Sequence, residues 1–251
     1  MLDSLRVVLV RTRFPENIGM VARAMANMGA SRLVLVAPEM WDREKAAPLA
    51  TSQGQAILDG VTVVEGLGEA LAPCSLAIAA TARTGGWRRQ MLSPERAALR
   101  FRAAAREGGQ LALVLGSEDR GLSNAEVELC TELVNIPTAA GHSSLNLAQA
   151  ALVLLYECVK AAMDLPFEAQ GARREWTKPA RGADSRRATL EEEGLLLSTL
   201  QDALIRIGHL PEENPGWFMQ PMRRFLRKSR LRRHEYDMLM GICRQVRNMQ
   251  K

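Results

Sequence analysis

Short apolar runs alternate with amphipathic segments through the first 163 residues, and this alternation restricts the chain to one class of fold. The runs are nearly continuous, as in parallel strands that are covered on both faces; they occupy residues 5–10, 33–36, 61–64, 75–80, 111–115 and 133–136. Helical periodicity occupies residues 18–28, 46–58, 94–106, 124–130 and 145–163. Strands that alternate with helices in this way predict an α/β domain over residues 1–163, with a parallel sheet flanked by helices.

Two of the predicted helices begin with recognisable cap signals. Ser93-Pro94 is typical of an N-cap followed by proline at the first helical position, and Ser123 with Glu126 forms a capping-box pattern. In the last helix of the domain, apolar residues recur at steps of three and four, which predicts one face packed on the sheet. These residues are Leu145, Ala148, Leu152, Leu155, Val159 and Met163.

The remaining third of the chain has a different organisation. Residues 164–188 contain glycine, proline and several cations without periodicity, which indicates a basic linker. Residues 189–251 predict a small all-helical extension of three helices. The first opens at the capping box of Thr189 and Glu192, the second runs from Asn214-Pro215 to about residue 228, and the third spans residues 233–248. The residues expected to face inward are Leu196, Leu200, Leu204, Ile207, Leu239, Ile242, Cys243 and Val246.

The positive charge of the chain is confined to this last third. Residues 1–163 contain 16 basic and 16 acidic residues, so the net charge of +5 arises entirely from residues 164–251. Its densest part has no acidic residue between the cations, which are Arg223, Arg224, Arg227, Lys228, Arg230, Arg232 and Arg233. A solvated helix face is the ordinary interpretation of such a run. The missing acids favour an anionic partner such as nucleic acid.

Several classes of protein are disfavoured by what the sequence lacks. The 4 cysteines form no CxxC pair, so we expect buried free thiols and no metal site. No apolar run approaches the ~20 residues that span a bilayer, and the first residues carry no targeting pattern, so we expect a cytoplasmic protein without membrane contact. His142 precedes Ser143-Ser144, but the Gly-x-Ser-x-Gly elbow of a hydrolase is absent. Neither a P-loop nor a GxGxxG segment is present.

Three segments with small polar residues stand where predicted strands end. The carboxyl ends of parallel strands form the ligand site of open α/β sheets, so we expect these segments to surround one ligand. The segments are Asn17-Ile18-Gly19 with Arg23-Ala24-Met25; Leu115-Gly116-Ser117-Glu118-Asp119-Arg120-Gly121-Leu122; and Ile136-Pro137 followed by Ser143-Ser144-Leu145-Asn146-Leu147-Ala148.

In order and spacing, these segments resemble the three motifs of the SPOUT superfamily of RNA methyltransferases, in its SpoU branch of 2'-O-methylating enzymes. The resemblance covers residues 5–160. The stretch from Gly208 to Gly216, with the basic helix after it, resembles the helical extension of the TrmJ family of bacterial tRNA 2'-O-methyltransferases. Thr81-Ala82-Arg83 after the fourth strand also matches that family.

The resemblance implies a fold and a cofactor that periodicity alone does not reveal. The family's α/β domain ends in a deep trefoil knot, although knots are nearly absent from proteins, and it forms a homodimer whose sites use both subunits. Tyr156 and Met163 on the last helix are then available to a partner. The knot loops hold S-adenosylmethionine, with backbone groups of Ile136 and Leu145 reading the adenine. The implied cofactor contacts are Thr81, Ala82, Arg83, Gly116, Ile136, Ser143, Ser144 and Leu145.

The resemblance also assigns catalytic and RNA-binding roles. Arg23, Ser144 and Asn146 are the implied catalytic residues. Because a guanidinium stays protonated, we expect Arg23 to stabilise the developing 2'-alkoxide rather than to act as a base; the alternative for Arg23 is a surface salt bridge. Ser144 and Asn146 would orient the hydroxyl or the cofactor, although Asn146 is also suited to cap the helix that follows. The expected RNA contacts are Asn17, Glu118, Arg223, Arg224, Arg227 and Lys228.

The function implied is S-adenosylmethionine-dependent 2'-O-methylation of tRNA, at the pyrimidine of nucleotide 32 in the anticodon loop. Two alternatives remain open: a methyltransferase of the same superfamily acting on ribosomal RNA, and a non-catalytic RNA-binding protein on the same scaffold. The presence of Arg23, Ser144 and Asn146 disfavours the last alternative. Glu118 has a second interpretation too, in which it holds a loop rather than taking part in the chemistry.

Overall fold

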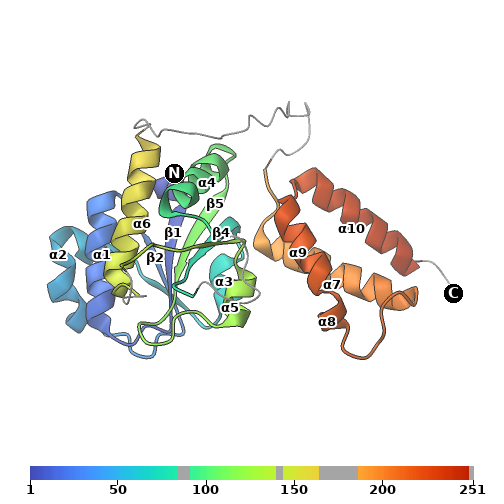
Figure 1. Cartoon of the computed structure of the whole chain (residues 1–251), viewed down its shortest axis with the longest axis horizontal. Helices are drawn as coiled ribbons and strands as arrows, with labels where there is room; N and C mark the ends of the chain where they lie inside the picture. The colour runs from blue at the N-terminus through green and yellow to red at the C-terminus, as the bar shows by residue number, and fades with distance from the viewer. Residues whose placement is uncertain (84–90, 140–143, 164–185, 249–251) are drawn as a thin grey trace. The chain divides into compact units, whose positions relative to one another are not determined.

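The computed structural model of the 251-residue chain describes residues 1–83, 91–139, 144–163 and 186–248. It divides the chain into two compact units, Met1–Gly171 and Ala172–Lys251 (Figure 1). The first unit contains the sheet and the second is helical.

A fully parallel six-stranded sheet forms the centre of the first unit, in the order β3-β2-β1-β5-β4-β6. The strands are β1 (Leu5–Val10), β2 (Arg32–Val36), β3 (Thr62–Val64), β4 (Cys74–Ala80), β5 (Gln110–Leu115) and β6 (Glu132–Val134). All six predicted strands are confirmed, although β6 ends two residues before the predicted limit. The chain turns in opposite directions after β1 and after β5, which are neighbours, so their carboxyl ends flank a crevice of the kind that binds ligands.

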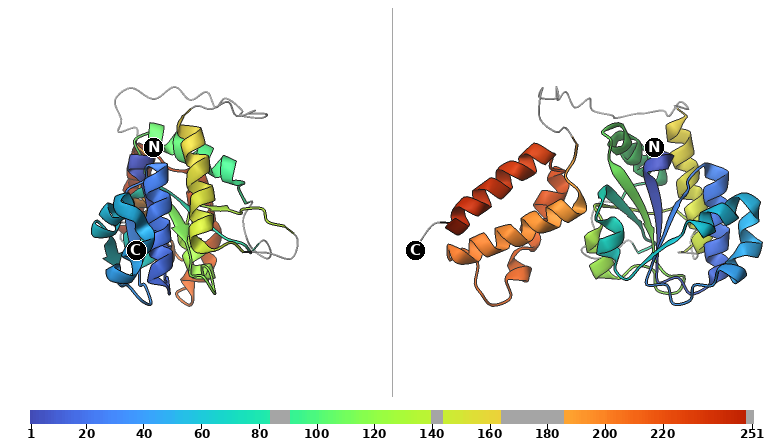
Figure 2. Two further views of the ribbon diagram at one scale, coloured as in Figure 1. Left: turned by 90° about the vertical axis from the view of Figure 1, so that its left-hand side faces the viewer. Right: turned by 180° about the vertical axis from the view of Figure 1, so that it is seen from behind.

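Helices cover both faces of this sheet (Figure 1, Figure 2). The helix α6 packs against both α1 and α4, and α2 packs on α1, whereas α3 and α5 contact each other. The helices are α1 (Pro15–Met28), α2 (Arg43–Asp59), α3 (Leu67–Leu71), α4 (Pro94–Arg106), α5 (Asn124–Leu129) and α6 (Leu147–Ala162), after a short 3-10 helix at Leu2–Ser4. The caps at Ser93 and Ser123 are confirmed. Helix α3 was not predicted, because five residues are too few to show a period.

The Asn17–Gly19 segment lies inside α1, which begins three residues before the predicted limit of residue 18. The helix begins at Pro15, whose ring suits the first helical position. A Cβ atom on Gly19 would lie 2.1 Å from the carbonyl oxygen of Ala46 in α2. Gly19 is therefore required by the close packing of two helices and not by a turn.

The buried face of α6 differs from the predicted one. The residues that pack into the core are Leu147, Ala148, Ala151, Leu154, Leu155, Cys158 and Ala161. Leu152, which was predicted to face the sheet, is exposed, and so are Tyr156 and Met163, which were expected to be available to a partner. Because apolar residues occur all around this helix, spacing alone does not identify which of two apolar stripes meets the sheet. The exposed stripe consists of Leu145, Leu152, Tyr156 and Met163.

The second unit contains α7 (Leu190–Arg206), α8 (Pro215–Phe218), α9 (Gln220–Ser229) and α10 (Arg233–Asn248). The predicted second helix is interrupted at Met219, the residue between α8 and α9 in the sequence. The side chain of Met219 is buried. Ile207 and Ile242 are exposed, so their predicted inward orientation is wrong. The core consists of Ala188, Leu196, Leu197, Ala203, Leu210, Met219, Leu226, Leu231, Tyr236, Met240 and Cys243.

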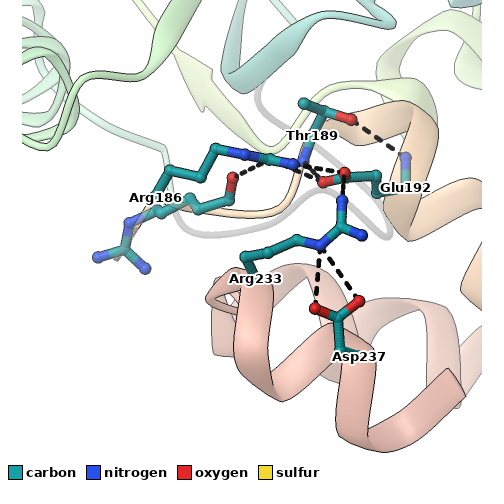
Figure 3. Close-up of polar contacts among 6 residues, drawn as sticks. Arg186, Thr189, Glu192, Arg233 and Asp237 are labelled. Carbon is teal, nitrogen blue, oxygen red and sulfur yellow. Dashed lines mark hydrogen bonds and ion pairs between the residues drawn. The ribbon is translucent and has the colours of Figure 1, made fainter. Parts of the chain in front are cut away.

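Glu192 ties the start of α7 to the start of α10 (Figure 3). Its carboxylate accepts two hydrogen bonds from Arg186, at 2.7 and 2.9 Å, and pairs with Arg233. It also closes the capping box with Thr189, while Arg233 reaches Asp237 at 3.1 Å. The Arg186 hydrogen bonds are the main reason that the pKa of Glu192 is lowered to about 2.

Glu193, the next residue, has the opposite environment. Its side chain is only 7% exposed, and burial raises its pKa to about 7 even though Arg227, Arg187 and Arg230 oppose the shift. Acidic residues of α7 and α10 therefore face several cations of the 223–233 run. The cations have no acidic residue between them in the sequence, but in space the carboxylates of Glu192 and Glu193 lie near several of them.

We expect Glu193→Gln to stabilise the second unit at pH 8. The pKa of Glu193 is raised on folding, so its contribution to stability is complete below pH 4.5 and is lost as the pH rises through about 7. Removing the buried charge should raise the free energy of unfolding by up to about 3 kcal/mol at pH 8 and change it little near pH 4.5. Calorimetric unfolding of the full chain between pH 4.5 and 8 measures this.

The control is Glu191→Gln, which changes an exposed carboxylate in the same turn. Glu192 must stay intact, because its lowered pKa makes stability fall toward acid pH, between 4.5 and about 2. Parallel pH profiles for Glu193→Gln and the parent would contradict the assigned burial effect.

Candidate active site

A pocket of about 310 Å³ opens at the carboxyl ends of β4, β5 and β6 and at the start of α6. Seven of the eight expected cofactor contacts line it: Thr81, Ala82, Arg83, Gly116, Ile136, Ser144 and Leu145. Ser143 lies outside the described residues. Contacts proposed from three separate parts of the sequence thus converge on one cavity.

The wall of the pocket is held together around β6. The amide of Thr81 donates to Val134 at 3.0 Å on one side, and the amide of Leu92 donates to Leu133 at 2.8 Å. Asn135 completes the arrangement, because its backbone amide donates to Leu92 at 3.1 Å and its side-chain amide donates to Thr81 at 2.9 Å. Asn135 was missed in the sequence. No motif contains it, and an asparagine at the end of a strand is a weak signal by itself.

The loop after β5 closes tightly on itself. A Cβ atom on Gly116 would lie 2.3 Å from the carbonyl carbon of Gly121 and 2.4 Å from the nitrogen of Leu122, so only glycine fits. The amide of Gly121, which has a φ of +63°, donates to Ser117 at 2.9 Å. Gly116 therefore shapes the pocket through its backbone, independently of any contact that it makes with a ligand.

Two arginines hold this loop from outside through its carbonyl oxygens. Arg83 donates to Arg120 at 2.7 Å, and Arg11 donates to Gly121 at 3.1 Å. Arg11 also pairs with Glu126 in α5. The positions of β1, β4 and α5 are thereby linked to the shape of the pocket rim.

Hydrogen bonds join all three motifs through Asn17, Glu118 and Asn146. The side-chain amide of Asn17 donates to the carboxylate of Glu118 at 2.6 Å, and the side-chain amide of Asn146 donates to the side-chain oxygen Oδ1 of Asn17 at 3.1 Å. Asn17 is only 7% exposed. The other carboxylate oxygen of Glu118 accepts the backbone amide of Arg13 at 3.2 Å. Glu118 thus holds the β1 and β5 loops together, as its second interpretation suggested.

Asn146 also caps α6. Its side-chain oxygen accepts the amides of Ala148 at 2.9 Å and Gln149 at 3.4 Å. One side chain therefore starts the helix and, through its amide group, fixes the helix start against Asn17. Ser144, two residues earlier, lines the pocket on the segment that this contact anchors.

Arg23 lies on α1, exposed, and does not line the pocket of its own chain. Within the described residues its guanidinium makes neither a hydrogen bond nor an ion pair, so the salt-bridge alternative has no support there. Of the three predicted catalytic residues, only Ser144 lines the pocket; Asn146 lies between two lining residues, Leu145 and Leu147, and Arg23 lies outside the lining.

Reactive thiols, metal sites and membrane-spanning helices find little support in the part of the chain that the structure describes. The four cysteines are free and buried, and burial raises the pKa of Cys74 to about 11 and that of Cys158 to about 12, so neither is a thiolate near neutral pH. Over the same residues, no group of three or more His, Cys, Asp or Glu side chains is arranged for a metal ion. None of the described helices combines the length and apolarity needed to cross a bilayer.

Known proteins match both units. The family model described as SpoU rRNA Methylase family matches residues 4–156, and that of the tRNA methyltransferase TrmJ, C-terminal domain, matches residues 191–251. The TrmJ tRNA (cytidine/uridine/adenosine-2'-O-)-methyltransferase of Pseudomonas aeruginosa is 37% identical over 249 residues, 99% of this chain and 96% of its own length. The TrmJ tRNA (cytidine/uridine-2'-O-)-methyltransferase of Salmonella typhimurium is 34% identical over 251 residues, 100% of this chain and 99% of its own length.

Among solved structures, TrmJ from Z. mobilis superposes with a TM-score of 0.77 at 28% identity, covering 97% of this chain and 99% of that one. Both units are thus matched by proteins of one type, in one order and over nearly their full length. The chain belongs to the SpoU methylase family and, within it, to the TrmJ methyltransferases.

Proposed function

We propose that this protein is an S-adenosylmethionine-dependent tRNA 2'-O-methyltransferase that acts on the pyrimidine at nucleotide 32 of the anticodon loop. The observation that carries the proposal is the Asn17–Glu118–Asn146 network beside the pocket, because it fixes the three family motifs in one arrangement. The names of the TrmJ relatives support tRNA as the substrate and the ribose 2'-oxygen as the acceptor. In this proposal the protein acts in the cytoplasm, together with its tRNA substrate.

The pocket suits the cofactor. Its volume of about 310 Å³ falls at the lower end of the range of small-molecule sites. It is built from loop backbone around Gly116 and Ile136, which can hydrogen-bond an adenine without bulky side chains. When bound, S-adenosylmethionine supplies a methyl group on a sulfonium, an excellent leaving group.

The protein's task is then to orient the ribose and to control the hydroxyl proton. The network holds the segment with Ser144, whose hydroxyl can accept or donate at the pocket edge. Arg23 offers fixed donors to the developing alkoxide and to the adjacent phosphate. Asn17 and Glu118 stay proposed RNA neighbours, although both are already engaged in intramolecular hydrogen bonds.

We propose a homodimer in which Arg23 serves the pocket of the partner subunit. Two observations support this: Arg23 does not line the pocket of its own chain, and α6 exposes an apolar stripe that includes Leu152, Tyr156 and Met163. Exposed apolar stripes of this kind mark interfaces. The family's deep trefoil knot is part of the same proposal. It is supported by the backbone hydrogen bonds that Thr81 and Leu92 donate to opposite sides of β6, because the chain then lies on both sides of that strand.

In this proposal residues 1–163 bind the cofactor, residues 164–188 form a basic linker, and residues 189–251 bind tRNA and support the dimer. Of the four cations expected to meet RNA, Arg224 and Lys228 are exposed on α9, whereas Arg223 and Arg227 are half-buried. A methyltransferase acting on ribosomal RNA remains the second candidate, because the matched family model is described by that substrate.

The direct test is methylation of unmodified total RNA with labelled S-adenosylmethionine, followed by mapping of the modified nucleotide. We expect label in tRNA, at the ribose of nucleotide 32. Label confined to ribosomal RNA would favour the second candidate, and binding of the cofactor without methylation of any RNA would contradict the proposed activity.

We expect Gly116→Ala to abolish cofactor binding. The added Cβ atom would force the loop away from Gly121 and deform the pocket, so affinity for S-adenosylhomocysteine should fall at least about a hundredfold in calorimetry. Gly66→Ala is the matched control, because a Cβ atom there meets nothing within 4 Å. Wild-type affinity in Gly116→Ala would show that the loop does not shape the cofactor site.

We expect Arg23→Ala to lower turnover about a hundredfold while cofactor affinity changes little, because one preorganised electrostatic contact is lost. Arg23→Lys should fail as well, since an ammonium cannot make a planar two-pronged contact.

The use of Arg23 across the dimer is tested in mixed dimers of Arg23→Ala and Gly116→Ala chains, purified with two different tags. If Arg23 acts on the partner's pocket, one site per mixed dimer is complete, and about half the wild-type turnover returns. Inactive mixed dimers, with both parent variants folded, would place Arg23 and the pocket in the same chain.

A further inference from the structure

Exposed aromatic side chains are concentrated on α8 and α9 of the second unit. The chain has only 4 tryptophans, 2 tyrosines and 5 phenylalanines. Three of these, Trp217, Phe218 and Phe225, lie within nine residues and are 62%, 47% and 64% exposed. This is an unusual use of scarce aromatic residues in a unit with a small core.

The core of the second unit does not account for them. Helix α9 packs inward through Leu226, and Met219 fills the junction with α8. Phe225 precedes Leu226, is therefore rotated about 100° from it around the helix, and is 64% exposed on the part of the surface where an amphipathic helix normally carries polar residues. Its ring contributes little to the core, so contact with another molecule explains its presence better than folding does.

Two cations lie on the same side of α9 as Phe225. Arg224 and Lys228 are exposed at positions i and i+4 of α9, with Phe225 between them, so the three side chains lie on one side of the helix. Only Met219 separates α8 from α9. The rings of Trp217 and Phe218 meet edge to face, with centroids 5.1 Å apart at 85°, which holds the two rings at a defined relative orientation.

Aromatic rings interleaved with cations match unpaired nucleotides. Cations pair with phosphates, and ring faces stack on bases that are not already stacked in a duplex. A double helix offers only phosphates, riboses and groove edges to such a surface, and a protein partner would not need the cations. A solubilising role explains Arg224 and Lys228 but not the rings between and beside them.

We propose that Trp217, Phe218, Arg224, Phe225 and Lys228 form a stacking surface that binds unpaired nucleotides of the RNA substrate. This deepens the proposed function, since it rests on RNA being the substrate. It assigns base-stacking contacts, beyond backbone charge, to the second unit. It also implies that a single-stranded loop, rather than a paired stem, is what this unit recognises.

The test compares the full-length protein with a Trp217→Leu/Phe225→Leu double variant and a Trp217→Phe/Phe225→Tyr double variant. Leucine keeps apolar bulk without a π face, whereas the second pair keeps the rings. All four changes lie at exposed positions, so the core is untouched. The probes are a fluorescein-labelled oligouridylate of twelve nucleotides and a blunt-ended, fully paired RNA duplex of similar length.

We expect the leucine variant to bind oligouridylate at least about tenfold more weakly, with duplex affinity changed less than twofold, and the aromatic variant to bind like the parent. The salt dependence of the leucine variant should be unchanged, because its phosphate contacts remain. In contrast, Arg224→Gln/Lys228→Gln should flatten the slope of log affinity against log salt by about 1.4 units. Equal oligouridylate affinity in the leucine variant and the parent would overturn the proposal.

A second readout excludes other occupants of the surface. In a chain with Trp41, Trp87 and Trp176 changed to phenylalanine, Trp217 is the single tryptophan, and oligouridylate should quench its fluorescence in proportion to binding. Unquenched fluorescence at saturating RNA, or a change of oligomeric state in the leucine variant, would show that protein covers the rings and would overturn the proposal. These binding measurements need no methyl transfer, so failure of the proposed methylation is detected separately, by absence of labelled RNA.

Discussion

The hydrogen bond from Asn17 to Glu118, at 2.6 Å, is the interaction on which the arrangement of the site depends. It joins the first helix to the loop after β5, and Asn146 extends it to the start of α6. Hydrogen bonds to a charged acceptor are short and strong. Because Asn17 is almost completely buried, losing one partner would leave a polar group unsatisfied at a cost of about 1–3 kcal/mol. The three motifs, distant in sequence, are therefore fixed by a short chain of side chains.

This chain of hydrogen bonds requires the backbones to approach closely, and glycine makes that possible. Gly19 lets α2 pack against α1 near the start of the network, and Gly116 lets the β5 loop fold back on Gly121. A side chain at Gly19 would push α2 away from α1, which carries Asn17, and one at Gly116 would open the loop that carries Glu118. The two glycines thus belong to the site although neither offers a functional group.

Much of the fold could be predicted from the sequence, because strands and helices depend on local period and caps. The strands, the capping boxes at Ser123 and Thr189, and the start of α10 at Arg233 appear as expected. The errors arise where orientation depends on partners far along the chain. The stripe of α6 that meets the sheet, and the outward side chain of Ile242, are decided by packing that no local pattern encodes.

The site could be predicted only in part, because its hydrogen bonds also connect residues that are far apart in the sequence. Resemblance located the pocket residues, and the cavity at the strand ends contains those that the structure describes. Asn135 was not predicted, because its two hydrogen bonds, to Thr81 and Leu92, connect segments whose proximity periodicity does not reveal. The network was invisible in the same way, since its members were identified as separate motifs and their hydrogen bonds exist only in three dimensions.

The cations of the second unit show why charge must be weighed by position and not by number. Arg233 is held by Glu192 and Asp237, and Arg227 faces the buried Glu193, so both take part in the folding of the unit. Arg224 and Lys228 instead point outward beside Phe225. The run of seven cations therefore contains some that stabilise the helices and others, Arg224 and Lys228, that are exposed. Since these exposed cations lie beside exposed rings, the proposed RNA surface is narrower, and chemically more selective, than net charge alone suggests.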